Sequence, residues 1–238
     1  AFPFKMSCQD VARISTPSLM QTRQSVALFW PNVVCYLRFL LALLAFAMVG
    51  RSEPLVVAFL YSVNATLDGL DGYLARVLGQ ATEFGGILDV LVDNLSRGMM
   101  WSLALPAPWS TLPLFLEMLA FVCTHKDGGA AWKSGCFVEA PPLVATIVRN
   151  GFRTPVGALT VMGLHFLPVC VWFCQRSEYG VLVASSLGPF LLAGRLLAFH
   201  AEAWIILRYF GSVLDRDVEQ HTAARQARAG DAGAKKRT

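Results

Sequence analysis

The chain has 238 residues, of which 55% are hydrophobic and only 15% are charged, and its formal net charge is +4. Soluble domains carry about 25% charged residues, so this composition excludes a disordered chain or a collagen and argues against an ordinary soluble globule. The mild positive charge gives no case for nucleic-acid binding. At about 20 apolar residues per bilayer crossing, the length allows roughly five to seven transmembrane helices.

Six apolar stretches follow one another along the chain, and each is predicted to form a transmembrane helix. They cover residues 26–49, 55–78, 86–105, 111–124, 156–174 and 181–210. Segments with glycine or proline separate them, as is typical of turns. The sequence therefore predicts an all-α integral membrane protein with six transmembrane helices. Its expected parts are an N-terminal cytoplasmic segment (1–24), a membrane domain (25–212) and a polar cytoplasmic tail that is a frayed helix or disordered (213–238).

The basic residues indicate the topology. With six spans, both termini and the connections between helices two and three and between helices four and five face the same side. That side carries most of the lysines and arginines, whereas the opposite side carries only Arg51 and Arg176. The positive-inside rule then places both termini in the cytoplasm.

Four aspartates lie in the second and third predicted helices, where a charged side chain is costly and usually functional. Asp68 and Asp71 are three positions apart, and Asp89 and Asp93 are four positions apart. Each spacing places both carboxylates of a pair on one face of its helix. The connection between the two helices is short, so they should be antiparallel neighbours whose acidic faces converge.

Such a cluster needs cations, because four carboxylates repel one another strongly at low dielectric. Only Arg76 and Arg97 lie close in the sequence, and two guanidinium groups cannot neutralise four acids. Oxygen ligands suit hard divalent ions such as Mg²⁺ or Mn²⁺, so we expect one or two of these ions at the cluster. The alternative is a buried ion-pair network that only packs the helices.

Small residues next to the acids suggest a ligand. Gly72 follows Asp71 directly, and Ala75 lies on the same helix face, with Arg76 beside it. Glycine destabilises a helix interior by about 1 kcal/mol relative to alanine, but it lets a ligand approach the backbone closely. Arginine donates forked hydrogen bonds to phosphate oxygens. The pattern indicates a diphosphate site; a helix contact through small residues is the alternative for Gly72 and Ala75.

These residues form a longer pattern. Asp68-Gly-Leu-Asp71-Gly72-Tyr-Leu-Ala75-Arg76 is followed, after eight residues, by Gly85-Gly-Ile-Leu-Asp89-Val-Leu-Val-Asp93. This segment resembles the signature of the CDP-alcohol phosphotransferase family, D-x2-D-G-x2-A-R-x8-G-x3-D-x3-D, at all eight fixed positions and in every gap. The six-helix layout is similar too, so the resemblance covers roughly residues 24–215.

The resemblance implies a role for each signature residue. The four aspartates would hold two divalent ions, Mg²⁺ or Mn²⁺, and the ions together with Arg76 would hold the diphosphate of a CDP-linked lipid. Gly72 would let the nucleotide lie against its helix. Asp93 would also be the general base that takes the proton from the acceptor hydroxyl.

Two positions outside the signature are implied to bind the nucleotide as well. Thr82 falls where the family often has a serine or threonine that touches the CDP group. Pro31-Asn32, followed by Arg38, resembles the PN-x5-R opening of the family's first helix, and there Asn32 would meet the nucleotide.

The acceptor alcohol is suggested by finer similarity. The stretches Phe29–Arg38, Gln80–Asn94 and Phe152–Pro155 look most like eukaryotic phosphatidylinositol synthases, which implies transfer of a phosphatidyl group from CDP-diacylglycerol to myo-inositol with release of CMP. Arg153 would then face the acceptor hydroxyls, unless it only anchors the helix end at the cytoplasmic surface. The fourth helix departs from that pattern. Glycerol 3-phosphate, serine, or diacylglycerol with CDP-choline or CDP-ethanolamine therefore stay open.

The same resemblance implies an endoplasmic reticulum membrane protein with its active site facing the cytosol, and it suggests a homodimer. Two other classes remain as alternatives: a divalent-cation channel or transporter, and a non-catalytic protein that binds CDP-lipid. No ladder of acids crosses the predicted spans, which argues against the channel. The intact signature argues against the non-catalytic protein.

Overall fold

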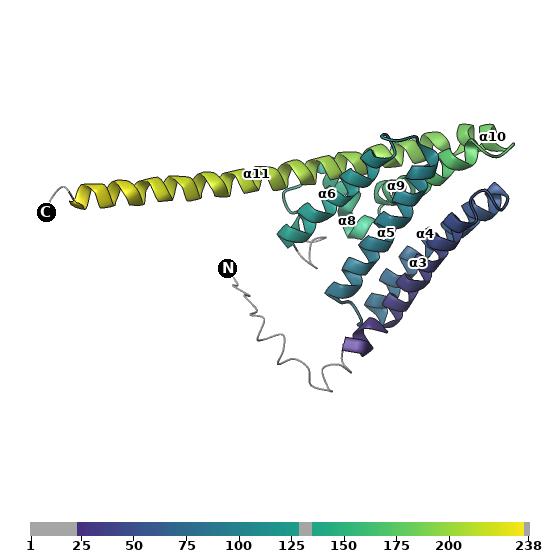
Figure 1. Cartoon of the computed structure of the whole chain (residues 1–238), viewed down its shortest axis with the longest axis horizontal. Helices are drawn as coiled ribbons and strands as arrows, with labels where there is room; N and C mark the ends of the chain where they lie inside the picture. The colour runs from purple at the N-terminus through teal and green to yellow at the C-terminus, as the bar shows by residue number, and fades with distance from the viewer. Residues whose placement is uncertain (1–22, 129–134, 236–238) are drawn as a thin grey trace. The chain divides into compact units, whose positions relative to one another are not determined.

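A computed structural model describes residues 23–128 and 135–235, and its regular structure in these ranges is helical, without strands (Figure 1). The helices are α3 (Trp30–Ala47), α4 (Pro54–Val77), α5 (Glu83–Ala104), α6 (Thr111–Gly128), α8 (Pro142–Phe152), α9 (Pro155–Cys174), α10 (Gly180–Ser186) and α11 (Gly188–Lys235). The all-α prediction is thereby confirmed. Most of the predicted N-terminal segment (1–22) and the last three residues of the tail (236–238) lie outside the described residues.

Three of the described helices combine the length and the apolar composition that a bilayer crossing requires. They are α3, α9 and the part of α11 from Gly188 to Arg225. These helices support a membrane protein. The arrangement of six spans with both termini in the cytoplasm stays a prediction.

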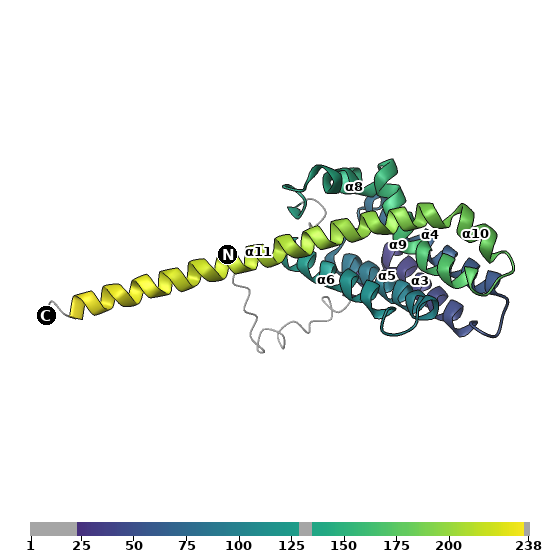
Figure 2. The ribbon, with the colours of Figure 1, turned by 90° about the horizontal axis from the view of Figure 1, so that it is seen from above.

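The chain divides into two compact units, and the first comprises residues 1–105 and 168–181. Within it α3, α4 and α5 lie side by side (Figure 1 and Figure 2). Helix α3 packs along α4 and also against α5, whereas α4 and α5 touch each other much less. The buried side chains of these helices include Cys35, Ala42, Val57, Tyr61, Val92 and Trp101. Helix α3 therefore supplies much of the packing surface for the two helices that carry the acids.

The connection between α4 and α5 is short and its conformation is set locally. Helix α4 ends at Val77, and Gly79 follows with a φ of +62°, in the left-handed region that favours glycine. Thr82 is the N-cap of α5, and its Oγ1 accepts a hydrogen bond from the Gly85 N–H at 3.0 Å. The tight turn and the cap together fix where α5 begins relative to the end of α4.

The second unit comprises residues 106–167 and 182–238. Here α6 packs against α11, and Cys123, Cys136, Ile205 and Ile206 form a buried apolar cluster. Arg195 of α11 is buried and lies 2.9 Å from Glu202 and 3.7 Å from Glu117 of α6. Arg195, Glu117 and Glu202 are therefore paired inside the unit.

Three features differ from the helices predicted from the apolar stretches. Helix α8 was not predicted, because its 11 residues are too few to span a bilayer. The stretch 181–210 is not one helix: α10 ends at Ser186 and α11 begins at Gly188. The polar tail, predicted as a frayed helix or disorder, continues α11 as a helix through Lys235.

Candidate active site

The four signature aspartates converge on one guanidinium group in the first unit. Asp68 and Asp71 come from α4, and Asp89 and Asp93 come from α5, while the guanidinium belongs to Arg38 of α3. Arg38 Nη1 lies 2.6 Å from Asp71 Oδ2 and 2.7 Å from Asp89 Oδ1. Its Nη2 lies 3.2 Å from Asp68 Oδ1 and also pairs with Asp93 Oδ1. Three helices thus contribute to a single cluster of charges.

Arg38 is the residue that the sequence analysis missed. The sequence analysis named Arg76 and Arg97 because they lie close to the acids in sequence. It did not place Arg38 in the cluster, because Arg38 precedes Asp71 by 33 positions and reaches it only through helix packing. A signal was present: α3 is an apolar helix without an acidic residue. A buried arginine in such a helix must find its counter-ions on neighbouring helices.

A second arginine binds one edge of the cluster. Arg97 Nη1 lies 2.9 Å from Asp93 Oδ2, one helical turn away, and Arg97 Nη2 donates to Asn94 Oδ1 at 3.0 Å. Asp93 therefore receives hydrogen bonds from both Arg38 and Arg97. When four carboxylates and these two guanidinium groups are ionised, their charges sum to −2 (−4 + 2). The protein's own cations leave the cluster incompletely neutralised.

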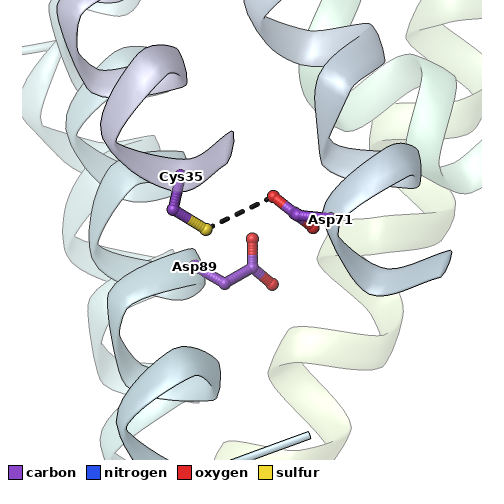
Figure 3. A group of neighbouring side chains, drawn as sticks. All are labelled: Cys35, Asp71 and Asp89. Atoms are coloured by element: carbon purple, nitrogen blue, oxygen red, sulfur yellow. Dashed lines mark hydrogen bonds between the residues drawn. The ribbon is translucent and has the colours of Figure 1, made fainter. Parts of the chain in front are cut away.

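The carboxylates of the cluster fit a hard divalent cation, whereas the neighbouring Cys35 thiol does not. The ligand atoms of Cys35, Asp71 and Asp89 lie within 4.8 Å of one another, and these side chains point toward one another from α3, α4 and α5 (Figure 3). Cys35 Sγ donates a hydrogen bond to Asp71 Oδ2 at 3.3 Å. Asp89 is 31% exposed, whereas Arg38 is 0% exposed, so one side of the cluster is accessible. Carboxylate oxygens and residual negative charge are what Mg²⁺ or Mn²⁺ require.

A pocket adjoins the cluster in the same unit. It is lined by Pro31, Asn32, Cys35, Asp71, Gly72, Ala75, Ala81, Thr82, Gly85, Gly86 and Asp89. The lining includes Asn32, Gly72 and Thr82, which are three of the four residues predicted to bind the CDP group. Two signature aspartates also line it, so a ligand in the pocket would touch the acidic cluster directly.

The fourth predicted nucleotide-binding residue lies next to this pocket. A Cβ built on Gly72 would be 3.4 Å from Arg76 Nη1 and 3.8 Å from Arg76 Nη2. The guanidinium group of Arg76 therefore lies over the glycine, one turn further along α4. A diphosphate that lies against Gly72 would be within reach of the forked donors of Arg76.

The wall of the pocket depends on a close contact between α3 and α5. Asn32 is buried, and its Nδ2 donates to the carbonyl oxygen of Val26 at 2.7 Å. Its Oδ1 lies against Gly85, where a Cβ would be only 2.7 Å away. Gly85 therefore has a steric reason to be glycine: it lets Asn32 reach the N-terminus of α5.

One predicted site residue belongs to the other unit. Arg153 lies at the C-terminal end of α8, where it is exposed. The backbone before it turns through positive φ values at Asn150 and Gly151. Its predicted contact with the acceptor alcohol stays a prediction.

Comparison with known proteins agrees with this geometry. Residues 28–133 match the family model of CDP-alcohol phosphatidyltransferase. This range contains the four aspartates, Arg38 and the pocket residues. The site therefore lies wholly within the region that matches this family model.

Within that class the similarity is to enzymes named for inositol. The chain is 35% identical over 103 residues to CDP-diacylglycerol–inositol 3-phosphatidyltransferase of Homo sapiens, which covers 43% of this chain and 48% of that protein. It is 36% identical over 95 residues to the Saccharomyces cerevisiae protein of the same name, covering 40% of this chain and 42% of the other. The chain thus spans about half the length of these curated relatives. The resemblance to phosphatidylinositol synthases is confirmed, and no solved structure matches the chain.

Proposed function

We propose that this protein transfers a phosphatidyl group from CDP-diacylglycerol to a hydroxyl of myo-inositol and releases CMP. One observation carries the proposal: all four signature aspartates converge beside a pocket that Asn32, Gly72 and Thr82 line. The matched family region, which includes the whole of this site, supports the reaction class. The names of the similar proteins support inositol as the acceptor.

The aspartate cluster is the proposed metal site. Asp68, Asp71, Asp89 and Asp93 would hold two divalent ions, Mg²⁺ or Mn²⁺, because their oxygens suit these ions and their charge exceeds that of Arg38 and Arg97. When bound, the ions neutralise the diphosphate and stabilise the charge that develops on the leaving CMP.

The pocket is the proposed site for the CDP group. Arg76 donates hydrogen bonds to the diphosphate, and Gly72 has no side chain to keep the nucleotide from α4. Asn32 and Thr82 contact the nucleotide from the opposite wall, formed by α3 and the start of α5. The substrate is thereby oriented with its diphosphate toward Asp71 and Asp89, which line the same pocket.

Asp93 is the proposed general base. The acceptor hydroxyl gives its proton to an Asp93 carboxylate oxygen while the hydroxyl oxygen bonds to the phosphorus of the phosphatidyl group. The bond from that phosphorus to the CMP oxygen breaks, so the electron pair leaves with CMP. The ion pair between Asp93 and Arg97 at 2.9 Å holds the carboxylate in one orientation.

The setting of the reaction is proposed as follows. The protein would be a multi-pass protein of the endoplasmic reticulum membrane, with six spans, both termini and the active site on the cytosolic side, and a homodimeric assembly. The three apolar helices support the membrane location. Arg153 would contact the acceptor hydroxyls.

The test supplies the purified full chain with Mn²⁺ or Mg²⁺, CDP-diacylglycerol and, separately, myo-inositol, serine and glycerol 3-phosphate. We expect CMP and phosphatidylinositol with myo-inositol alone. If a phosphatidyl product forms with another alcohol instead, that alcohol is the acceptor and the phosphatidyl-transfer reaction still stands. No CMP release with any acceptor would contradict the proposed function. Asp93→Asn is the inactive control, and Asp217→Asn, an exposed aspartate of α11, is its matched control.

A further inference from the structure

The guanidinium group of Arg38 stands where the four carboxylates meet. Each aspartate presents one oxygen to it: two to Nη1 at 2.6 and 2.7 Å, and two to Nη2, one of them at 3.2 Å. An ordinary structural ion pair joins one arginine to one or two acids. Here a single arginine joins two helices through four acids at once.

The side chain of Arg38 is fully buried. Its side chain is 0% exposed, although Asp68 and Asp89 in contact with it are 27% and 31% exposed. Its Nε lacks a hydrogen-bond partner within the described part of the chain. A buried donor without a partner is unfavourable, so the site binds the two terminal nitrogens well but does not satisfy the whole guanidinium group.

The position of Arg38 conflicts with full occupancy by divalent ions. A dication bound by these carboxylates would lie within a few ångströms of a full positive charge, and this repulsion is strong where water is excluded. Without any cation at the centre, however, the four carboxylates would repel one another. The cluster therefore needs a cation at all times, but Arg38 and a divalent ion at the same point would repel each other.

We propose that Arg38 is an internal counter-cation: it positions the four aspartates while no divalent ion is bound, and its guanidinium withdraws from them when ions bind. The proposal rests on the metal-dependent function proposed above. It makes metal binding an exchange of cations rather than the filling of an empty site. Arg38 is then a positioning residue that lowers the apparent affinity for metal and stabilises the metal-free fold.

The test compares Arg38→Gln and Arg38→Lys with Arg51→Gln. Arg51 is an exposed arginine whose guanidinium donates to the Ala47 carbonyl oxygen at 3.0 Å. Thermal unfolding of the full chain is measured in EDTA and with Mn²⁺, and Mn²⁺ binding is measured from the electron paramagnetic resonance signal of the free ion. In EDTA we expect Arg38→Gln to lower Tm by about 6 °C or more. We expect its Kd for Mn²⁺ to fall about tenfold or more.

Arg38→Lys should lie between the wild type and Arg38→Gln, because it keeps the charge but loses the fork that reaches four acids. Arg51→Gln should match the wild type in both measurements. An unchanged Tm in EDTA, or a Kd for Mn²⁺ that is equal or higher in Arg38→Gln, would overturn the proposal.

A charge-compensating variant covers the case in which Arg38→Gln does not fold. Removing Arg38 changes the charge sum from −2 to −3, and adding Asp68→Asn returns it to −2. The double variant should therefore recover folding in EDTA. If Arg38→Gln were destabilised only by lost packing, Asp68→Asn would not restore folding. Failure to recover would contradict the proposed role of Arg38 as a counter-cation. If the variants bind Mn²⁺ as expected but the wild type releases no CMP, the proposed function fails and the inference stands. If CMP is released while Kd does not fall, the inference alone fails.

Discussion

Asn32 Oδ1 lies where a side chain on Gly85 would have to go: a Cβ at that glycine would be 2.7 Å from the amide oxygen. This contact joins α3 to the first turn of α5. It also places Asn32 at the wall of the proposed CDP pocket. The lack of a side chain at Gly85 of α5 therefore determines where Asn32 of α3 lines that pocket.

Gly85→Ala should therefore damage both the fold and the site. The added methyl group would push Asn32 away and crowd Thr82 Oγ1, which would be 3.2 Å from it. We expect a loss of about 1–3 kcal/mol of stability and a higher KM for CDP-diacylglycerol. Gly86→Ala is the control for stability alone, because a Cβ there meets nothing within 4 Å among the described residues but Gly86 also lines the pocket. Equal Tm values for the two variants would show that the contact is not restrictive.

Asp93→Asn should separate binding from chemistry. The amide keeps the size of the side chain but cannot accept the proton of the acceptor hydroxyl. We expect binding of CDP-diacylglycerol to persist while the rate of CMP release falls by a factor of about 10² or more. Binding is measured by equilibrium titration and turnover by CMP release. Near-normal turnover would exclude Asp93 as the base.

Arg76→Ala should act mainly on the nucleotide. The guanidinium group beside Gly72 is exposed, so its loss should leave Tm nearly unchanged. Loss of hydrogen bonds from a charged donor should raise the KM for CDP-diacylglycerol about tenfold or more. Arg51→Ala, another exposed arginine, serves as the control. An unchanged KM in Arg76→Ala would remove this residue from the proposed diphosphate site.

Thr82 has a structural role that can be separated from any contact with substrate. Thr82→Ala removes the N-cap of α5 and should lower the stability by about 1 kcal/mol, whereas Thr82→Ser keeps the hydroxyl. Thr66→Ala, which removes a threonine hydroxyl bonded within α4 to Ser62, should change Tm less. If Thr82→Ser retains Tm but raises KM, the methyl group of Thr82 contacts the nucleotide. A Thr82→Ala variant as stable as the wild type would contradict the capping role.

Removal of divalent ions should abolish turnover reversibly. After dialysis against EDTA we expect no CMP release, and added Mn²⁺ or Mg²⁺ should restore it, because oxygen-ligated sites prefer these ions. CMP formation is followed before chelation, after it and after the ions are added back. Full activity in excess chelator would contradict the proposed metal site.

The parts of the site that were predicted from sequence depend on short-range spacing. Asp68 and Asp71 share a helix turn, as do Asp89 and Asp93, so helical periodicity alone placed each pair on one face. Gly72 and Arg76 are four positions apart, so helical periodicity places them on one face of α4 as well. The convergence of the two pairs also followed from local information, because the connection between α4 and α5 is only a few residues long.

The parts that were not predicted depend on packing between distant segments. Arg38 reaches Asp93 across 55 positions of sequence, and no spacing rule contains that contact. Helix α8 was missed because the search relied on the length of apolar runs, whereas α8 is short and buries only part of its surface, at Val144 and Ile147. The break at Leu187 was missed although Ser185-Ser186 precedes it and Gly188-Pro189 follows it. These residues are turn signals, but the search considered only the length of the apolar stretch.

The tight turn and cap between α4 and α5 limit how this segment of the gene can change. An α-helix turns about 100° per residue, so one residue inserted between Thr82 and Asp89 would rotate both carboxylates of α5 away from Arg38 of α3. Deletion of one residue there would rotate both carboxylates by a similar angle in the opposite direction. Natural variants of this protein should therefore have few insertions or deletions between residues 68 and 93. Substitutions on the outer helix surfaces should be more frequent.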